Sequence, residues 1–174
     1  MAHPSPHLFE GSLNQAPLWT PDGKRIVFNS NNAGAWNLFW QLSDGGGGLQ
    51  RLSTGEAAQI ATSWSRDGQL LAFYTGTLNT LRDVWVWQAT DRKAEPFLRT
   101  RFNEGAAKFS PDGHWLAYVS DESGGPHVYV QPYPASGGKW QISTDGGTEP
   151  VWNRNGAELF YRDGNKPAPS GTGC

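Results

Sequence analysis

The stretch SPDGHWLAY, residues Ser110–Tyr118, aligns without gaps with three other stretches of the same chain. These are TPDGKRIVF (Thr20–Phe28), SRDGQLLAF (Ser65–Phe73) and NRNGAELFY (Asn153–Tyr161). The central glycines, at positions 23, 68, 113 and 156, follow one another at intervals of 45, 45 and 43 residues. Such a regular period predicts a repeat protein, in which one supersecondary unit recurs along the chain.

Each repeat predicts four short antiparallel strands. In the first repeat, Asp22-Gly23 is typical of a hairpin turn, because glycine readily adopts the positive φ that these turns need. A short strand ends at Trp19 before this turn, and a second strand at 25–29 follows it. We expect a third strand over Trp36–Leu42 and a fourth over Leu49–Ser53. Four strands in a period of about 45 residues are typical of a β-propeller blade.

Composition supports an all-β chain. The 174 residues include 22 glycines, 12 prolines and nine tryptophans, whereas charged residues make up only 17%. This profile excludes a coiled coil or a helical bundle, and a disordered chain is not so rich in aromatic residues. With 14 basic against 16 acidic residues the net charge is −2, so neither nucleic acid nor an anionic membrane is expected as a partner. The single cysteine, Cys174, allows no internal disulfide.

The N-terminus, MAHPSPHLFE, has no basic start and no apolar core, so the sequence predicts no signal peptide. No apolar run approaches the length of a membrane span. The compartment stays unknown on these grounds, with the cytoplasm as the default expectation.

The repeats predict one domain over residues 1–164 and a flexible tail at 165–174. We expect a strand at 6–11, the fourth strand of a preceding blade, because Leu8 stands 11 residues before Trp19. Blades are expected at about 15–54, 60–100, 105–144 and 148–163, of which the last has only two strands. The predicted fold class is therefore all-β, a partial β-propeller of about 3.75 four-stranded antiparallel blades.

The repeat resembles that of the TolB-type β-propeller family. The resemblance rests on the pattern Trp-Ser/Thr-Pro-Asp-Gly, a following strand that ends in an aromatic residue, and an aromatic-rich third strand, and it covers Leu8 to Arg162. The stretch Ser120–Trp152 is also similar to propeller segments that follow bacterial serine/threonine protein kinase domains. The family implies a ring of six to eight blades, and this chain holds fewer than four. Arg154-Asn155 replaces Pro-Asp in the last repeat, and still suits a turn.

An incomplete propeller leaves an apolar sheet face uncovered at each end of the arc, where a neighbouring blade is missing. We expect a homodimer that closes an eight-bladed ring by strand exchange, as swapped dimers do. Its closure interface is predicted at Leu8 and Phe9 of one chain against Leu159, Phe160 and Tyr161 of the other. A closed four-bladed monomer, another stoichiometry, and a fragment that works within a longer protein are the alternatives.

The sequence predicts no catalytic residue, no cofactor and no metal site. The motifs G-x-S-x-G and H-E-x-x-H are absent, and GGGG at 45–48 lacks the Gly-Lys-Ser/Thr ending of a phosphate-binding loop. Asp22, Asp67 and Asp112 recur at the turn, where we expect them to accept local hydrogen bonds. The four histidines are scattered: His3, His7, His114 and His127.

The starts of the innermost strands are expected to surround the central channel, where propellers usually bind ligands. The polar candidates for this rim are Gln59, Asn103, Glu104 and Glu149. Trp19, Trp64 and Trp152 share one blade position and are predicted to lie in the core. The predicted function is a non-enzymatic interaction module that binds a protein or peptide. The alternative is a remnant or accessory propeller of a hydrolase or lyase, such as a serine peptidase, with catalysis elsewhere.

Overall fold

The computed structural model describes residues 12–76 and 81–163. These two ranges contain fourteen β-strands and no helix. The strands are β1 (Asn14–Trp19), β2 (Arg25–Ser30), β3 (Asn37–Leu42), β4 (Gln50–Arg51), β5 (Ala58–Trp64), β6 (Leu70–Gly76), β7 (Asp83–Gln88), β8 (Lys93–Leu98), β9 (Glu104–Phe109), β10 (Trp115–Ser120), β11 (His127–Pro132), β12 (Trp140–Gln141), β13 (Thr148–Trp152) and β14 (Leu159–Arg162). The predicted strand at 6–11 and the predicted tail at 165–174 lie outside the described residues.

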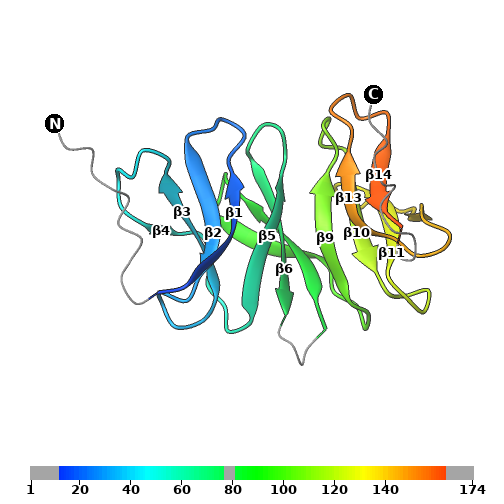
Figure 1. Cartoon of the computed structure of the whole chain (residues 1–174), viewed down its shortest axis with the longest axis horizontal. Helices are drawn as coiled ribbons and strands as arrows, with labels where there is room; N and C mark the ends of the chain where they lie inside the picture. Colours follow the sequence, from blue (N-terminus) through cyan, green and yellow to red (C-terminus); the bar gives the residue numbers. More distant parts are fainter. Residues whose placement is uncertain (1–11, 77–80, 164–174) are drawn as a thin grey trace, which may run out of the picture.

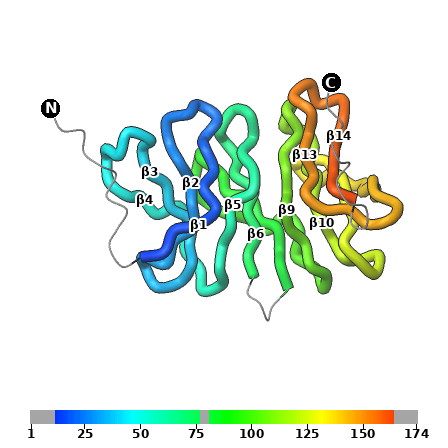
Figure 2. Tube along the Cα trace, viewed as in Figure 1, coloured from blue at the N-terminus to red at the C-terminus, as the bar shows by residue number. Residues whose placement is uncertain are grey.

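The strands form three four-stranded antiparallel sheets, β1–β4, β5–β8 and β9–β12, and a two-stranded sheet, β13–β14. The first strand of each sheet contacts the first strand of the next, from β1 through β5 and β9 to β13. Figures 1 and 2 show the sheets side by side in the order of the sequence, from blue at one end to orange at the other. The prediction of an all-β partial propeller is therefore confirmed.

The repeated Asp-Gly turn has the hydrogen bonds that its sequence predicts. The Ser65 hydroxyl donates to Asp67 Oδ1 over 2.6 Å, and the backbone N–H of Gln69 donates to the same oxygen over 3.0 Å. Both bonds favour the carboxylate and hold the pKa of Asp67 below its ordinary value. Gly68 has φ of +72°, which a residue without Cβ adopts at little cost. Asp22 and Asp112 accept the equivalent bonds in their own turns.

The inner strand of each sheet, which is its first strand, contains an irregularity that the repeat pattern does not reveal. The register against the second strand shifts in the middle of β1, β5, β9 and β13. In three of these strands a non-glycine residue at the shift has positive φ, namely Ala16, Ala106 and Glu149, at 50°, 50° and 54°. A bulge of this kind bends a strand and re-aims its side chains. It therefore decides which inner-strand residues face solvent and which face the neighbouring sheet.

The core lies between successive sheets. One buried cluster joins the first sheet to the second and includes Leu38, Phe73 and Trp87. A second cluster joins the second sheet to the third and includes Val86 and Tyr118. Each sheet thus covers its neighbour, as the blades of a propeller do.

The prediction that Trp19, Trp64 and Trp152 are all core is wrong for Trp19, which is 57% exposed. The indole of Trp64 packs against the buried cluster that joins the first sheet to the second, and Trp152 Nε1 donates to Lys108 O in the preceding sheet over 3.0 Å. This blade position therefore faces the preceding sheet. Trp19 is exposed because it lies in the first sheet, where no preceding sheet is described.

Candidate functional site

Three of the four predicted rim residues come together at the start of β9 and β13. Asn103, Glu104 and Glu149 line one pocket of about 360 Å³. Asp121 and Arg82 line the same pocket. Gln59 does not join them, since it lines a separate cavity of about 650 Å³ along β5 and β7.

Glu104 is the buried acidic residue of this pocket, with only 2% of its surface exposed. The Thr100 hydroxyl donates to its Oε1, whereas Oε2 has no hydrogen-bond partner among the described residues. Burial raises the pKa of Glu104 above its ordinary value, and the nearby carboxylates of Asp83, Asp121 and Glu122 add to the effect. The pocket therefore places one poorly solvated carboxyl group close to several other acids.

Asn103 and Asp121 are held together at the mouth of the pocket. Asp121 accepts hydrogen bonds from the Asn103 backbone N–H over 2.9 Å and from its side-chain amide over 2.7 Å. These bonds hold the pKa of Asp121 below its ordinary value, so its carboxylate stays ionised. Glu149 is exposed and forms an ion pair with Arg162 over 2.8 Å.

Gln59 has a structural partner. Its side-chain oxygen accepts a hydrogen bond from the Ser53 hydroxyl, and Gln59 is only 5% exposed. Ser53 lies just after β4, in the segment that links the first sheet to the second. Gln59 therefore fastens this link, a role that its position in the sequence does not distinguish from that of a rim residue.

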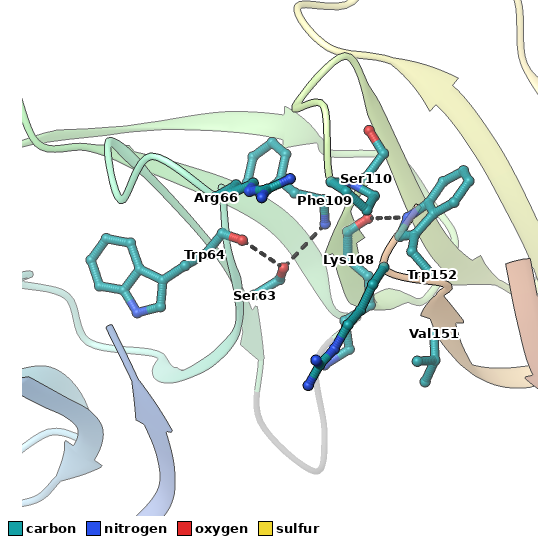
Figure 3. Close-up of a pocket in the computed structure, with 10 residues that line it drawn as sticks. Ser63, Trp64, Arg66, Lys108, Phe109, Ser110, Val151 and Trp152 are labelled. Atoms are coloured by element: carbon teal, nitrogen blue, oxygen red, sulfur yellow. Dashed lines mark hydrogen bonds between the residues drawn. The ribbon is translucent and has the colours of Figure 1, made fainter. Parts of the chain in front are cut away.

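The opposite ends of the inner strands form a second site, which sequence reasoning missed. A groove of about 480 Å³ crosses the ends of β5, β9 and β13 (Figure 3). Its lining contains three basic side chains and no acidic one: Arg66, Lys108 and Arg154. The repeat contains a signal for two of them, because Arg66 and Arg154 occupy the turn position held by Pro21 and Pro111 in the other repeats.

Hydrogen bonds between sheets hold the walls of this groove, as Figure 3 shows for two of them. The backbone N–H of Phe109 donates to Ser63 Oγ over 3.1 Å, and Trp152 Nε1 donates to Lys108 O over 3.0 Å. Lys108 Nζ donates to Thr62 O over 2.6 Å. Burial lowers the pKa of Lys108 below its ordinary value, because a half-buried ammonium loses hydration.

The predicted closure residues are described only in part. Leu159 is half-buried, Phe160 is 55% exposed and Tyr161 is 36% exposed, all on β14. Leu8 and Phe9 lie outside the described residues. Among the described residues no group of three or more His, Cys, Asp or Glu side chains is arranged to hold a metal ion. No described helix is long and apolar enough to span a membrane.

Comparisons with known proteins identify the repeat. Over 130 residues, 74% of this chain, it is 31% identical to the Tol-Pal system protein TolB of Anaeromyxobacter dehalogenans strain 2CP-C. TolB of Acinetobacter baumannii superposes with a TM-score of 0.74 at 18% identity, over 89% of this chain and 39% of that one. The repeats of this chain belong to the TolB-type β-propeller family. No family model matches the sequence.

The TolB likeness is partial in length. The matched region spans 29% of the curated relative, and 30% identity over the same share holds for TolB of a second Anaeromyxobacter dehalogenans strain. An oligogalacturonate lyase in complex with manganese also superposes, with a TM-score of 0.61, 12% identity, and 86% of this chain against 44% of that one. At this identity the likeness shows the fold alone. The similarity of Ser120–Trp152 to kinase-associated propellers stays a prediction.

Proposed function

We propose that this chain is a non-enzymatic TolB-type interaction module, which assembles with a second copy of itself and binds a protein or peptide partner. The observation that carries the proposal is the position of the exposed apolar side chains. On the second sheet, β5–β8, none of the described large apolar side chains is exposed. The exposed ones in strands lie on the first sheet and on the last two.

The two ends of the arc expose different apolar faces. Trp19, 57% exposed, lies on the face where a preceding sheet would pack. Val151 and Phe160 are paired across β13 and β14, so they lie on one face of the last sheet, and they are 56% and 55% exposed. Burying apolar area stabilises an assembly by about 25 cal/mol per Å² before association costs. In a two-fold dimer each Trp19 face meets the partner's Val151–Phe160 face, and two such contacts close the ring.

The relatives support an interaction role rather than a particular partner. Their name, Tol-Pal system protein, describes a component of a system. The alternative, an accessory propeller of a hydrolase or lyase, has fold-level support only, from neighbours such as a prolyl endopeptidase with a TM-score of 0.58 and 17% identity. No observed side-chain arrangement favours it over the interaction module.

Light scattering on a sizing column tests the self-assembly. The 174-residue chain is expected at about 38 kDa, twice the 19.0 kDa of one chain. Phe160→Lys is expected to shift it to one chain mass, because a charge then lies in the contact. Leu81→Lys is the matched control, since Leu81 is 46% exposed but lies outside the sheets. A 19.0 kDa wild type at every concentration, or equal dissociation of both variants, overturns the dimer.

Panning a phage-displayed random peptide library on the immobilised chain tests partner binding. A recurring peptide that also binds the chain in solution supports the module. If no sequence recurs, or if the selected peptides bind the heat-unfolded chain equally well, the peptide-binding part of the proposal is wrong.

A further inference from the structure

The groove at the ends of β5, β9 and β13 has an unbalanced charge. Arg66, Lys108 and Arg154 line it without an acidic neighbour in the lining. Among the described residues, the salt bridges involve other side chains, Arg99–Asp83, Lys139–Glu122 and Arg162–Glu149. Three positive charges therefore share one groove whose described lining holds no carboxylate to neutralise them.

Lys108 is the member whose position is set by the fold. Its ammonium is half-buried and donates to the carbonyl of Thr62, beside the irregularity of β5 between Ala61 and Ser63. A lysine ammonium has three N–H donors, and a single neutral carbonyl leaves its charge uncompensated. An anionic acceptor beside it gains a charge-assisted hydrogen bond, which is stronger than one between neutral groups.

The same strands carry the opposite charge at their other ends. Glu104 begins β9 and Glu149 lies near the start of β13, whereas Lys108 and Arg154 lie at or just beyond the ends of these strands. The acidic pocket therefore lies at the starts of β9 and β13, and the basic groove lies at the ends of the same strands. Since opposite charges attract, an anionic ligand is directed to the basic groove.

The walls of the groove are partly aromatic. Trp152 is half-buried in the lining, and Phe109 lies beside Lys108 (Figure 3). A groove that holds basic groups beside a partly exposed tryptophan suits a peptide in which carboxylates stand next to apolar side chains. Three cations on a chain of net charge −2 do not supply the extended basic surface that a nucleic acid requires.

We propose that the basic groove of Arg66, Lys108 and Arg154 binds the carboxylate groups of an acidic peptide segment. This inference rests on the proposed function and names the chemistry of the partner. It assigns the partner's acidic residues to the ends of β5, β9 and β13 and leaves the rim pocket at the other ends free of them.

Fluorescence anisotropy with two labelled, amidated peptides tests the groove. One peptide alternates glutamate with leucine, and the other has glutamine in place of glutamate. The glutamate peptide is expected to bind the folded chain, and Lys108→Gln and Arg154→Gln are each expected to weaken it roughly tenfold, the effect of one lost charge-assisted hydrogen bond. Lys93→Gln, which changes an exposed lysine on β8, is the control and keeps full affinity.

Other outcomes overturn the inference in distinguishable ways. Equal binding of both peptides shows that carboxylates are not required. Wild-type affinity in Arg154→Gln, an exposed position expected to fold normally, shows that the peptide does not bind in the groove. Displacement of the peptide by inorganic phosphate at equal concentration reassigns the groove to small anions. If panning selects neutral peptides while the glutamate peptide does not bind, the inference fails and the interaction module stands. If panning also yields nothing, both fail.

Discussion

Glu104 and Gln59 occupy the same position in successive repeats, nine residues before the turn glycines Gly113 and Gly68. Both are buried, and each accepts a hydrogen bond from a hydroxyl group that precedes its strand, that of Thr100 or Ser53. A neutral amide fills this place at a smaller solvation cost than a carboxylate, which must give up the hydration of its charge. The same hydrogen bond is therefore made to a neutral amide in one repeat and to a carboxyl group in the next.

Glu104→Gln is therefore expected to stabilise the chain at neutral pH by roughly 1 kcal/mol, the scale of one poorly satisfied buried polar group. The glutamine retains an acceptor for Thr100 and removes the charge. The folded-state pKa of Glu104 is raised above its ordinary 4.5, so the folded chain binds the proton more tightly than the unfolded chain. Wild-type stability then falls as pH rises from about 4.5 through the folded-state pKa, and the advantage of the variant grows over that window.

Urea unfolding at pH 4 and pH 7 measures this effect. The variant and the wild type are expected to differ at pH 7 and to converge at pH 4. Glu149→Gln is the matched control, because Glu149 is exposed and its ion pair with Arg162 contributes little. A gain from Glu149→Gln as large as that from Glu104→Gln shows that general charge reduction, and not the buried site, is responsible.

Sequence reasoning describes residues whose role is local more fully than residues whose role depends on the direction of the side chain. Asp67 accepts hydrogen bonds two residues before and after it, and such a motif is visible in the chain itself. The sequence predicts Gln59 and Glu104 at the channel rim but does not show that both are buried, because the direction of each side chain depends on the bulge that follows. A bulge formed by Ala106 at positive φ has no compositional signal, since alanine rarely adopts that conformation.

Individual strands were predicted closely where both faces are buried. The second and third strands of the repeats, such as β2 and β3, begin and end within a residue of their expected bounds. The fourth strand of the first repeat is shorter than predicted, since β4 covers only Gln50–Arg51 of the expected Leu49–Ser53. Both residues of β4 are exposed, so no burial pattern defines its ends.

Packing between elements centres on Trp87 of β7, which is only 2% exposed. Its ring meets Trp40 of the first sheet edge-on at 6.1 Å and Trp64 of its own sheet at 6.2 Å. Of these three tryptophans, only Trp64 lies at a spacing from the turn glycine at which aromatic residues recur in every repeat. Trp87 does not lie at such a spacing, and yet its ring joins two sheets.

Trp87→Ala is expected to destabilise the chain by about 3–5 kcal/mol, the usual cost of removing a buried aromatic ring. Trp140→Ala is the control on an outer strand, where the ring is 50% exposed and contacts Trp115 edge-on at 5.7 Å. Its expected cost is about 1 kcal/mol. Chemical unfolding of both variants measures the difference, and similar losses contradict a central role for Trp87.

At the scale of the whole molecule, the period of the repeat predicts sheets in a row, and the structure confirms it. Closure cannot be predicted in the same way, because a repeat specifies how each sheet meets the next and not where the row ends. In the part of the chain that the structure describes, each sheet packs against its neighbours in the row, so local stability is expected to vary along the chain as in other repeat proteins. The second sheet, β5–β8, is covered on both faces, whereas β13–β14 packs against described residues on one face only.

Hydrogen exchange is therefore expected to be slowest in β6 and β7 and much faster in β13 and β14 of the isolated chain, because covered sheets open least often. The proposed dimer adds a second expectation. When the concentration rises through the range in which the chain associates, protection of β13 and β14 increases while that of β6 and β7 stays the same. Mass spectrometry of exchanged peptides at two concentrations measures both. Equal protection of β6–β7 and β13–β14 in the dilute chain contradicts nearest-neighbour stability, and protection of β13–β14 that ignores concentration contradicts packing of a second copy on that face.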